Sequence, residues 1–269
     1  MNYKKEFINA LEFAEAKNLY LGSGNPNGKI LVIGKEHYYD HKSELNSDNF
    51  YKEILEVREN DIYKNLSSWR NNLTESFSPD WNDDLDSTII NSNPFTIYWN
   101  QKNKNNRIVN GVENGGTSNT YVNYQKIYQN VFLNGVKEKT INFQKDFFLS
   151  ELNDLPSKKS FNFQRLNDLR KSLIEERKEL FKKEFFRSFP ITIIASGHYP
   201  SQHNFDIEKI FNVKWTEETI NVGNSWYNLH YSNDKKRILI HTRQLSTSVS
   251  SVLIDSINPL GVIIYSKIN

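Results

Sequence analysis

The chain has no cysteine among its 269 residues. This absence excludes disulfide bonds, thiolate nucleophiles, zinc sites built on cysteine and iron–sulfur clusters held by thiolates. Any chemistry must therefore rest on carboxylates, imidazoles, hydroxyls or bound ions. An excess of charge of one sign is also absent, because 34 Lys and Arg stand against 32 Asp and Glu and the net charge is +2. Such a balance does not identify a partner, since a total charge does not reveal a basic face.

Long hydrophobic runs are missing as well. The longest are Ile191–Ala195 and Gly261–Tyr265, whereas a membrane-spanning helix needs about 20 apolar residues. The first residues, Met1–Glu6, lack the apolar stretch of a signal peptide. We therefore expect a cytoplasmic protein without membrane contact. The apolar share of 37%, with 13% aromatic residues, is enough for a sizeable core and excludes wholesale disorder.

Short runs rich in β-branched residues predict the strands of a sheet. Helical periodicity predicts helices between them, and this alternation favours a three-layer α/β/α fold with a central, mainly parallel sheet. The first, third and fourth runs are continuously apolar, as is typical of parallel strands covered on both faces. The predicted strands are Lys29–Gly34, Lys145–Ser150, Ile191–Gly197, Arg237–His241 and Gly261–Tyr265, and the predicted helices are residues 3–17, 47–72, 121–133, 163–187 and 247–257.

One polar stretch interrupts the alternation. Residues 73–118 are rich in turn residues, including Asn110-Gly111 and Gly115-Gly116. We interpret residues 40–140 as an insertion, with helices and a small hairpin, in a single domain that spans residues 1–269. We expect this domain to act as a monomer.

Polar side chains follow three of the predicted strands. In open α/β sheets, ligands bind beyond the carboxyl ends of the strands. Glu36 and His37 follow the first strand, Glu151 and Asn153 follow the second, and His241 ends the fourth. A carboxylate there can position water or stabilise a cationic transition state. The alternative is that these side chains cap helices or lie in solvated loops.

The segment after the fourth strand, His241-Thr242-Arg243-Gln244-Leu245-Ser246, combines several functional side chains. A neutral His241 can hydrogen-bond a developing anion. Arg243 and the hydroxyl groups can hold phosphates at the start of the next helix. An exposed Leu245 can wedge into a base stack. The alternative is an ordinary strand–helix loop with a buried histidine.

These two segments resemble motifs of the uracil-DNA glycosylase superfamily. Gly34-Lys35-Glu36 is similar to its Gly-x-Asp/Asn motif, and residues 241–246 are similar to its His-Pro-Ser-Pro-Leu-Ser motif. His241, Leu245 and Ser246 match in register, while residues 242–244 depart from the pattern. The lead-in Gly24-Asn25-Pro26-Asn27 also suits this group, but residues 40–140 have no clear counterpart.

The resemblance implies a DNA glycosylase that flips a base out of double-stranded DNA, cleaves its N-glycosidic bond and leaves an abasic site. Glu36 and His241 would be the catalytic residues: Glu36 would stabilise the sugar cation and orient water, and His241 would stabilise the departing base. Neither a metal nor a cofactor is expected. Base recognition falls to Glu151, Asn153 and His37, and DNA binding to Arg243, Gln244, Leu245, Ser246, Gly24 and Asn25.

The substrate prediction depends on Glu151, which stands where the superfamily usually has an asparagine. An amide can pair with both the N3–H donor and the O4 acceptor of uracil, whereas a carboxylate only accepts and therefore suits the exocyclic amine of cytosine. A protonated carboxyl, favoured by desolvation, could also donate to cytosine N3. The leading hypothesis is a modified cytosine. Some bacterial phage-defence relatives remove glucosylated hydroxymethylcytosine from phage DNA.

Three alternatives remain open. Asn153 could read the base instead, which would give a uracil-DNA glycosylase. A protein with this fold could bind modified DNA without catalysis. A metal-dependent hydrolase is the third, because imidazoles and a carboxylate cluster in the sequence at His37, Asp40, His41, His198 and His203.

Overall fold

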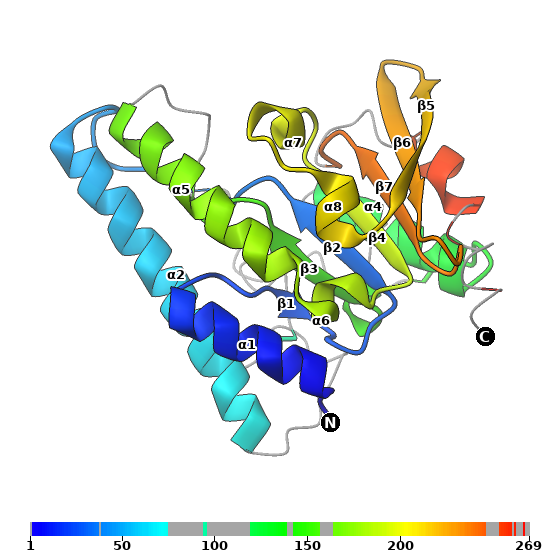
Figure 1. Ribbon diagram of the computed structural model, residues 1–269, viewed down its shortest axis with the longest axis horizontal. Coiled ribbons are helices and arrows are strands. Elements are labelled where there is room, and N and C mark those ends of the chain that lie inside the picture. Colours follow the sequence, from blue (N-terminus) through cyan, green and yellow to red (C-terminus); the bar gives the residue numbers. More distant parts are fainter. Residues whose placement is uncertain are drawn as a thin grey trace.

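The computed structural model of the chain is a mixed α/β fold around one seven-stranded sheet, in the order β1-β3-β2-β4-β7-β6-β5 (Figure 1). It describes residues 2–37, 39–74, 94–95, 119–138, 142–156, 164–245, 253–259, 261 and 266. The strands are β1 (Ser23–Gly24), β2 (Ile30–Gly34), β3 (Phe147–Glu151), β4 (Ile191–Ala195), β5 (Lys214–Val222), β6 (Ser225–Tyr231) and β7 (Ile238–Thr242). The helices are α1 (Lys5–Lys17), α2 (Asp48–Thr74), α4 (Asn119–Phe132), η3 (Phe143–Lys145), α5 (Gln164–Phe181), α6 (Glu184–Arg187), α7 (Tyr199–Gln202) and α8 (Ile207–Phe211).

Four strands form the parallel centre of the sheet. β2 pairs in parallel with β3 and β4, and β4 pairs in parallel with β7, so that Ile33 lies level with Ser150 and Ile194, and Ile194 with His241. The mixed α/β class and the four central strands are therefore as the sequence predicts. β1 and the hairpin β5–β6 add antiparallel strands at the two edges. Most of the fifth predicted strand, residues 262–265, lies outside the described residues.

Helices cover both faces of this sheet because its apolar side chains alternate between two core clusters. Leu31 and Ile33 of β2 belong to one cluster, together with residues of α1, α5 and α6. Ile30 and Val32 belong to the other, together with residues of α4 and of the helical segment 253–259. Figure 1 shows α1 and α5 on the near side of the sheet and α4 behind it. The result is three layers, as period-two alternation in a doubly covered strand requires.

The predicted insertion at residues 40–140 contributes to both outer layers. Ile62 and Trp69 of α2 lie in the first cluster, and Ile127 and Val131 of α4 lie in the second. These two helices are therefore parts of the layered core. The hairpin expected between them falls on residues outside the described part of the chain. The hairpin that the structure does describe, β5–β6, follows β4 instead.

The long helix predicted at residues 163–187 is two helices. α5 ends at Phe181 and α6 begins at Glu184, with Lys183 in an extended conformation between them. This break turns Phe185 and Phe186 into the first core cluster, where both are buried. Among the described helices, none is long and apolar enough to span a membrane.

Candidate functional site

The carboxyl ends of the parallel strands gather the polar residues of the candidate site. The chain leaves β2 to form β3 on one side, whereas it leaves β4 to form β7 on the other. The exits of β2 and β4 are therefore adjacent and diverge, which is the switch point where open α/β sheets bind ligands. Since β4 separates β2 from β7, these two strands are about 10 Å apart in the sheet. His241 lies level with Ile33, so Glu36 is three residues further along the chain, beyond the end of β2.

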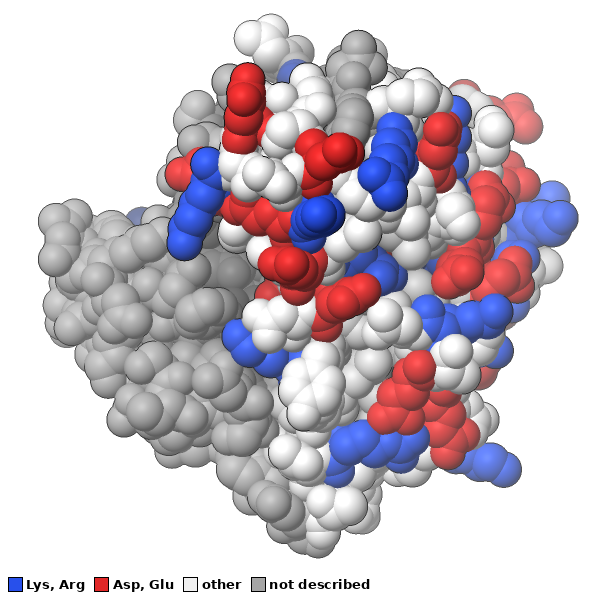
Figure 2. Space-filling model, turned by 90° about the vertical axis from the view of Figure 1, so that its left-hand side faces the viewer, with Lys and Arg blue, Asp and Glu red and all other residues white. Residues whose placement is uncertain are grey.

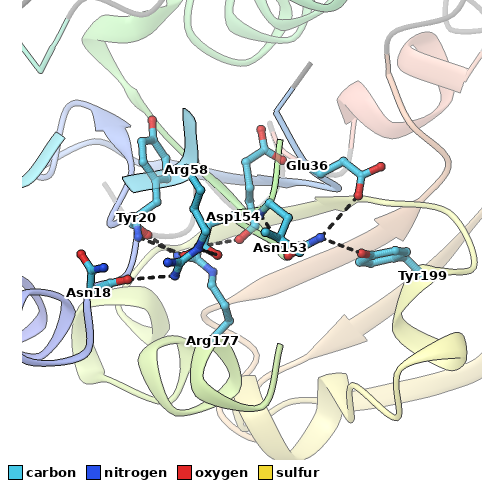
Figure 3. A network of polar contacts seen from close by, with 10 residues as sticks. Asn18, Tyr20, Glu36, Arg58, Asn153, Asp154, Arg177 and Tyr199 are labelled. Carbon is cyan, nitrogen blue, oxygen red and sulfur yellow. Dashed lines mark hydrogen bonds and ion pairs between the residues drawn. The ribbon is translucent and has the colours of Figure 1, made fainter. Parts of the chain in front are cut away.

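Glu36 is a fixed carboxylate at the exit of β2. Its side chain is only 8% exposed and its Oε1 lies 3.2 Å from the Lys35 ammonium. Asn153 Nδ2 donates to Oε2 at 3.5 Å and to the Tyr199 hydroxyl at 3.1 Å (Figure 3). Burial, and then the charge of Glu36, raise the pKa of Tyr199, so this phenol stays neutral. The carboxylate thus contacts one cation and one neutral donor, the Asn153 amide beyond the exit of β3.

Glu151 ends β3 and folds its carboxyl group over Gly34. A Cβ at Gly34 would lie 2.2 Å from Glu151 Oε2, so only glycine leaves room for this arrangement. Oε2 is buried and has no hydrogen-bond partner among the described residues. Burial raises the pKa of Glu151 from its ordinary value of 4.5 to about 8; the charge of Arg177 lowers it and that of Glu36 adds to the rise. At neutral pH the group is a protonated acid that can donate a hydrogen bond.

Asn153 is predicted to read a base, and the structure gives its amide another task. The side chain is fully buried. Its Nδ2 donates to Glu36 and Tyr199, and its Oδ1 accepts the Leu155 N–H at 3.2 Å. Both N–H groups of the amide are thereby used inside the protein. The amide holds Glu36 in place rather than presenting a free edge to a ligand.

Burial keeps His241 neutral, and its N–H is already engaged in a hydrogen bond. The ring packs edge-on against Trp226, with centroids 5.0 Å apart. Burial lowers the pKa of His241 to about 4, while the hydrogen bond to the Gly197 carbonyl opposes this shift. Nε2 therefore carries the proton and donates it to that carbonyl at 2.8 Å. To donate to a departing base, the imidazole must first release Gly197.

His37 lies beside Glu36 and is neutral as well. Its ring packs edge-on against Tyr20, with centroids 4.5 Å apart. Burial, followed by the charge of Arg177, lowers the pKa of His37 to about 4. A neutral imidazole at this position remains compatible with contact to a base.

The histidines of the metal alternative are dispersed. His41 packs on Phe50, His198 on Trp226 and His203 on Tyr199. Within the described ranges, no three His, Asp or Glu side chains come together in a way that could hold a metal ion. Although these residues are close in sequence, they do not form a set of metal ligands in the described part of the chain.

The predicted wedge residue, Leu245, is not exposed. It is 1% exposed in the second core cluster, and its carbonyl accepts the Asn123 amide at 2.8 Å. The wedge prediction is wrong because the chain turns inward after β7. Arg243 and Gln244 are exposed beside it, with Arg243 Nη1 donating to the Asn224 carbonyl at 2.7 Å. Ser246 lies outside the described residues.

Gly24 and Asn25 lie at the opposite edge of the sheet. β1 runs antiparallel to β3, so it carries the chain toward the amino ends of the parallel strands. There the Asn25 N–H donates to the Phe147 carbonyl at 2.7 Å. Gly24 has a φ of +111°, and a Cβ at this position would lie 2.3 Å from the same carbonyl oxygen. Phe147 begins β3, about 13 Å from the carboxyl edge at 3.3 Å per residue. These two residues are therefore not brought together with the other predicted site residues at the carboxyl edge.

A buried ionic network supports the site from below. Asp154 accepts both Nε and Nη2 of Arg58, at 3.0 and 3.2 Å, and also the Tyr20 N–H at 3.3 Å (Figure 3). Arg177 of α5 donates to the Ser150 hydroxyl at 2.8 Å and to the Glu151 carbonyl. Sequence reasoning missed Arg58, Asp154, Arg177 and Tyr199. A signal for Arg177 existed, because it falls on the same helical stripe as Leu166, Leu173 and Leu180, where a charge must find a buried partner.

Comparison of the chain with family models, with curated proteins and with solved structures found no match.

Proposed function

We propose that the protein is a DNA glycosylase that excises a cytosine-type base by hydrolysis of its N-glycosidic bond. One observation carries the proposal: two carboxyl groups at neighbouring strand exits, Glu36 and Glu151, interact electrostatically and lie in different environments. Glu36 is paired with the Lys35 ammonium and accepts a hydrogen bond from the Asn153 amide. Glu151 is desolvated, and burial raises its pKa to about 8, so it is protonated at neutral pH. Such a divergence between neighbouring carboxyls is the usual basis for assigning an acid and a base.

The roles follow from these two environments. As the bond between the sugar C1′ and the base nitrogen breaks, its electron pair goes to the base and positive charge develops on the sugar. The Glu36 carboxylate stabilises that charge and takes a proton from the water that attacks C1′. The Glu151 carboxyl donates its proton to the departing base. The products are an abasic site and the free base, and no metal or cofactor takes part in these steps.

Glu151 also favours a cytosine-type base. Its protonated carboxyl can donate to N3, and its other oxygen can accept from the exocyclic amine. Uracil presents the reverse pattern at N3, and the Asn153 amide that could read it is committed to Glu36 and Tyr199. The resemblance to phage-defence glycosylases makes glucosylated hydroxymethylcytosine the first substrate to test.

DNA contact is proposed at the carboxyl edge, through the exposed Arg243 and Gln244. Figure 2 draws the side of the molecule on which α2 and α5 lie in Figure 1, and basic and acidic side chains of the described residues are interspersed there rather than segregated. That face therefore shows no single-signed patch of the kind that usually marks a nucleic acid footprint.

Base release from a panel of duplexes tests the proposal. The panel contains cytosine, hydroxymethylcytosine, its glucosylated form and uracil, and mass spectrometry identifies the released base. We expect E36Q and E151Q to slow release by about 100-fold or more, as loss of a positioned acid or base does. Glu12 is exposed on α1, so E12Q is the matched control.

The pH profile separates the two carboxyls. Wild-type activity should fall as the pH rises past about 8, where Glu151 loses its proton, and E151Q should lack this limb. Wild-type rates in both variants would refute the assignment. Tight binding of modified duplexes without an abasic product would show a binding protein instead.

A further inference from the structure

We infer that His198 and Trp226 form a stacking subsite for an unpaired nucleobase, beside the site of base excision. The inference rests on the proposed function and adds a binding site to it. β6 runs antiparallel to β7 and pairs Tyr227 with Thr242, so Trp226 lies at the carboxyl edge of the sheet. His198 lies at the same edge, because it follows β4 and directly precedes α7.

The two rings form a short aromatic stack that is open to solvent at its outer end. The ring centroids of His198 and Trp226 are 5.2 Å apart, and their planes differ by 30°. His198 is exposed, whereas Trp226 is half-buried. One face of the imidazole lies on the indole, so its other face can receive a further flat ring. A nucleobase placed there would continue the stack.

The inner end of the stack is held in place. Trp226 packs edge-on against His241, with centroids 5.0 Å apart, and the His241 ring is fixed by its hydrogen bond to the Gly197 carbonyl. The Trp226 carbonyl accepts the Thr242 hydroxyl at 2.6 Å. Rings that are ordered before a ligand arrives lose little conformational entropy on binding. The structure therefore provides a preformed platform rather than two independent side chains.

Arg243 adds a positive charge beside this platform. Its Nη1 donates to the carbonyl of Asn224 at 2.7 Å, two residues before Trp226 in the chain. Arg243 is exposed, and a guanidinium has five N–H donors, so donors remain for a phosphate. Proteins commonly bind single-stranded nucleic acid by combining aromatic rings with positive charge. The combination favours a nucleotide over an uncharged aromatic ligand.

The subsite would hold a neighbour of the excised nucleotide rather than the excised base. β6 lies three strand spacings from β2, which is about 14 Å at roughly 4.8 Å per spacing. Glu36 and Glu151 follow β2 and β3, so a base held between them is too far away to lie on His198 as well. In a duplex, neighbouring bases cover both faces of each base. The platform therefore selects an unstacked base, of the kind that base flipping creates.

Binding of short single strands tests the subsite. The probes are fluorescein-labelled oligothymidine, oligocytidine and oligoadenosine of about eight nucleotides, a length within the usual range for single-strand sites. A fourth probe has the same phosphates but abasic tetrahydrofuran units throughout. Fluorescence anisotropy measures Kd. Because stacking tolerates any base, we expect the three oligonucleotides to bind within about fivefold of one another, and the abasic chain to bind about tenfold more weakly or worse.

Substitutions assign the binding to the two rings. W226A and H198A should each raise the Kd of oligothymidine by about tenfold, as loss of a stacked base does, and should leave that of the abasic chain unchanged. W226F and H198Y keep an aromatic ring and should keep most of the affinity. Trp215 is 39% exposed and lies at the other end of the same hairpin, opposite His230, so W215A is the matched control and should bind as wild type. R243Q should weaken binding of both probes, and less so at high salt.

Two results would overturn the inference. One is wild-type affinity in both W226A and H198A, and the other is equal binding of the abasic chain by the wild type, which would show that only phosphates are bound. H198A removes an exposed ring, so it provides the test even if W226A does not fold. If the variants lose affinity but no duplex releases a base, the subsite stands and the glycosylase proposal fails. If bases are released while both variants bind as wild type, the glycosylase proposal stands and the subsite fails.

Discussion

The raised pKa of the Glu151 carboxyl depends on Gly34. The absence of a Cβ lets the Glu151 carboxyl lie against the β2 backbone, where it is desolvated. The sequence predicts Glu151 as a ligand-facing carboxyl, and its protonation follows from this contact. Glycine at the end of a strand usually suggests a turn, so the sequence alone gives no reason to connect these two positions.

We predict that G34A destabilises the protein by about 1–3 kcal/mol, the usual cost of overpacking a filled site. The added methyl group would collide with the Glu151 carboxyl and displace it. Chemical denaturation measures the free energy of unfolding. In an E151A background the methyl group has room, so G34A should cost much less there. An equal cost in both backgrounds would show that the β2 backbone, and not Glu151, rejects the methyl group.

At the scale of elements, α2 is tied to the exit of β3 by the buried pair Arg58–Asp154. Both side chains are almost fully buried, at 9% and 1% exposure. Arg58 Nη2 also donates to the Asn18 carbonyl at 2.9 Å, so one guanidinium joins α2 to the end of α1 as well. Three segments far apart in sequence thereby meet beneath Asn153 and Glu36.

R58A should lower the free energy of unfolding by about 3–5 kcal/mol, because it leaves the Asp154 charge buried without its cation. Thermal or chemical denaturation provides the measurement. Arg165 and Asp48 form an exposed pair, with side chains 59% and 84% exposed. R165A is thus the matched control and should cost less than about 1 kcal/mol. Similar losses in the two variants would contradict the role given to the buried pair.

For the whole molecule, buried ionisable groups predict a stability maximum near neutral pH. Folded Glu151, with a pKa of about 8, keeps a proton that the unfolded chain releases above its ordinary pKa of 4.5, so this group destabilises the fold as the pH rises. His37 and His241, with pKa values of about 4, stay neutral when folded, while the unfolded chain binds protons below 6.5. Their contribution is therefore lost as the pH falls from 6.5 toward 4.

We expect the free energy of unfolding to peak between about pH 6.5 and 7 and to decline on both sides. E151Q should flatten the alkaline decline up to pH 8, and H241N should reduce the acid decline. Denaturant titrations at closely spaced pH values measure these slopes, with E12Q as the control. If the free energy of unfolding of E151Q still declines toward alkaline pH, Glu151 is not the buried group that loses a proton there.

The sequence by itself determined the four parallel strands and most helices, because buried strands and amphipathic helices have apolar periodicities that do not depend on their neighbours. It also determined that polar side chains follow β2, β3 and β7. The hairpin β5–β6 also has a turn signal, Gly223-Asn224, between its two strands. It is not predicted because β5 is mostly exposed and lacks the apolar residues by which the other strands are recognised. Only the tertiary structure decided which side chains meet. Tyr199 reaches Asn153 across the sheet, Leu245 turns into the core, and antiparallel β1 carries Gly24 to the far edge. These outcomes depend on strand order and direction, which local residue patterns do not encode.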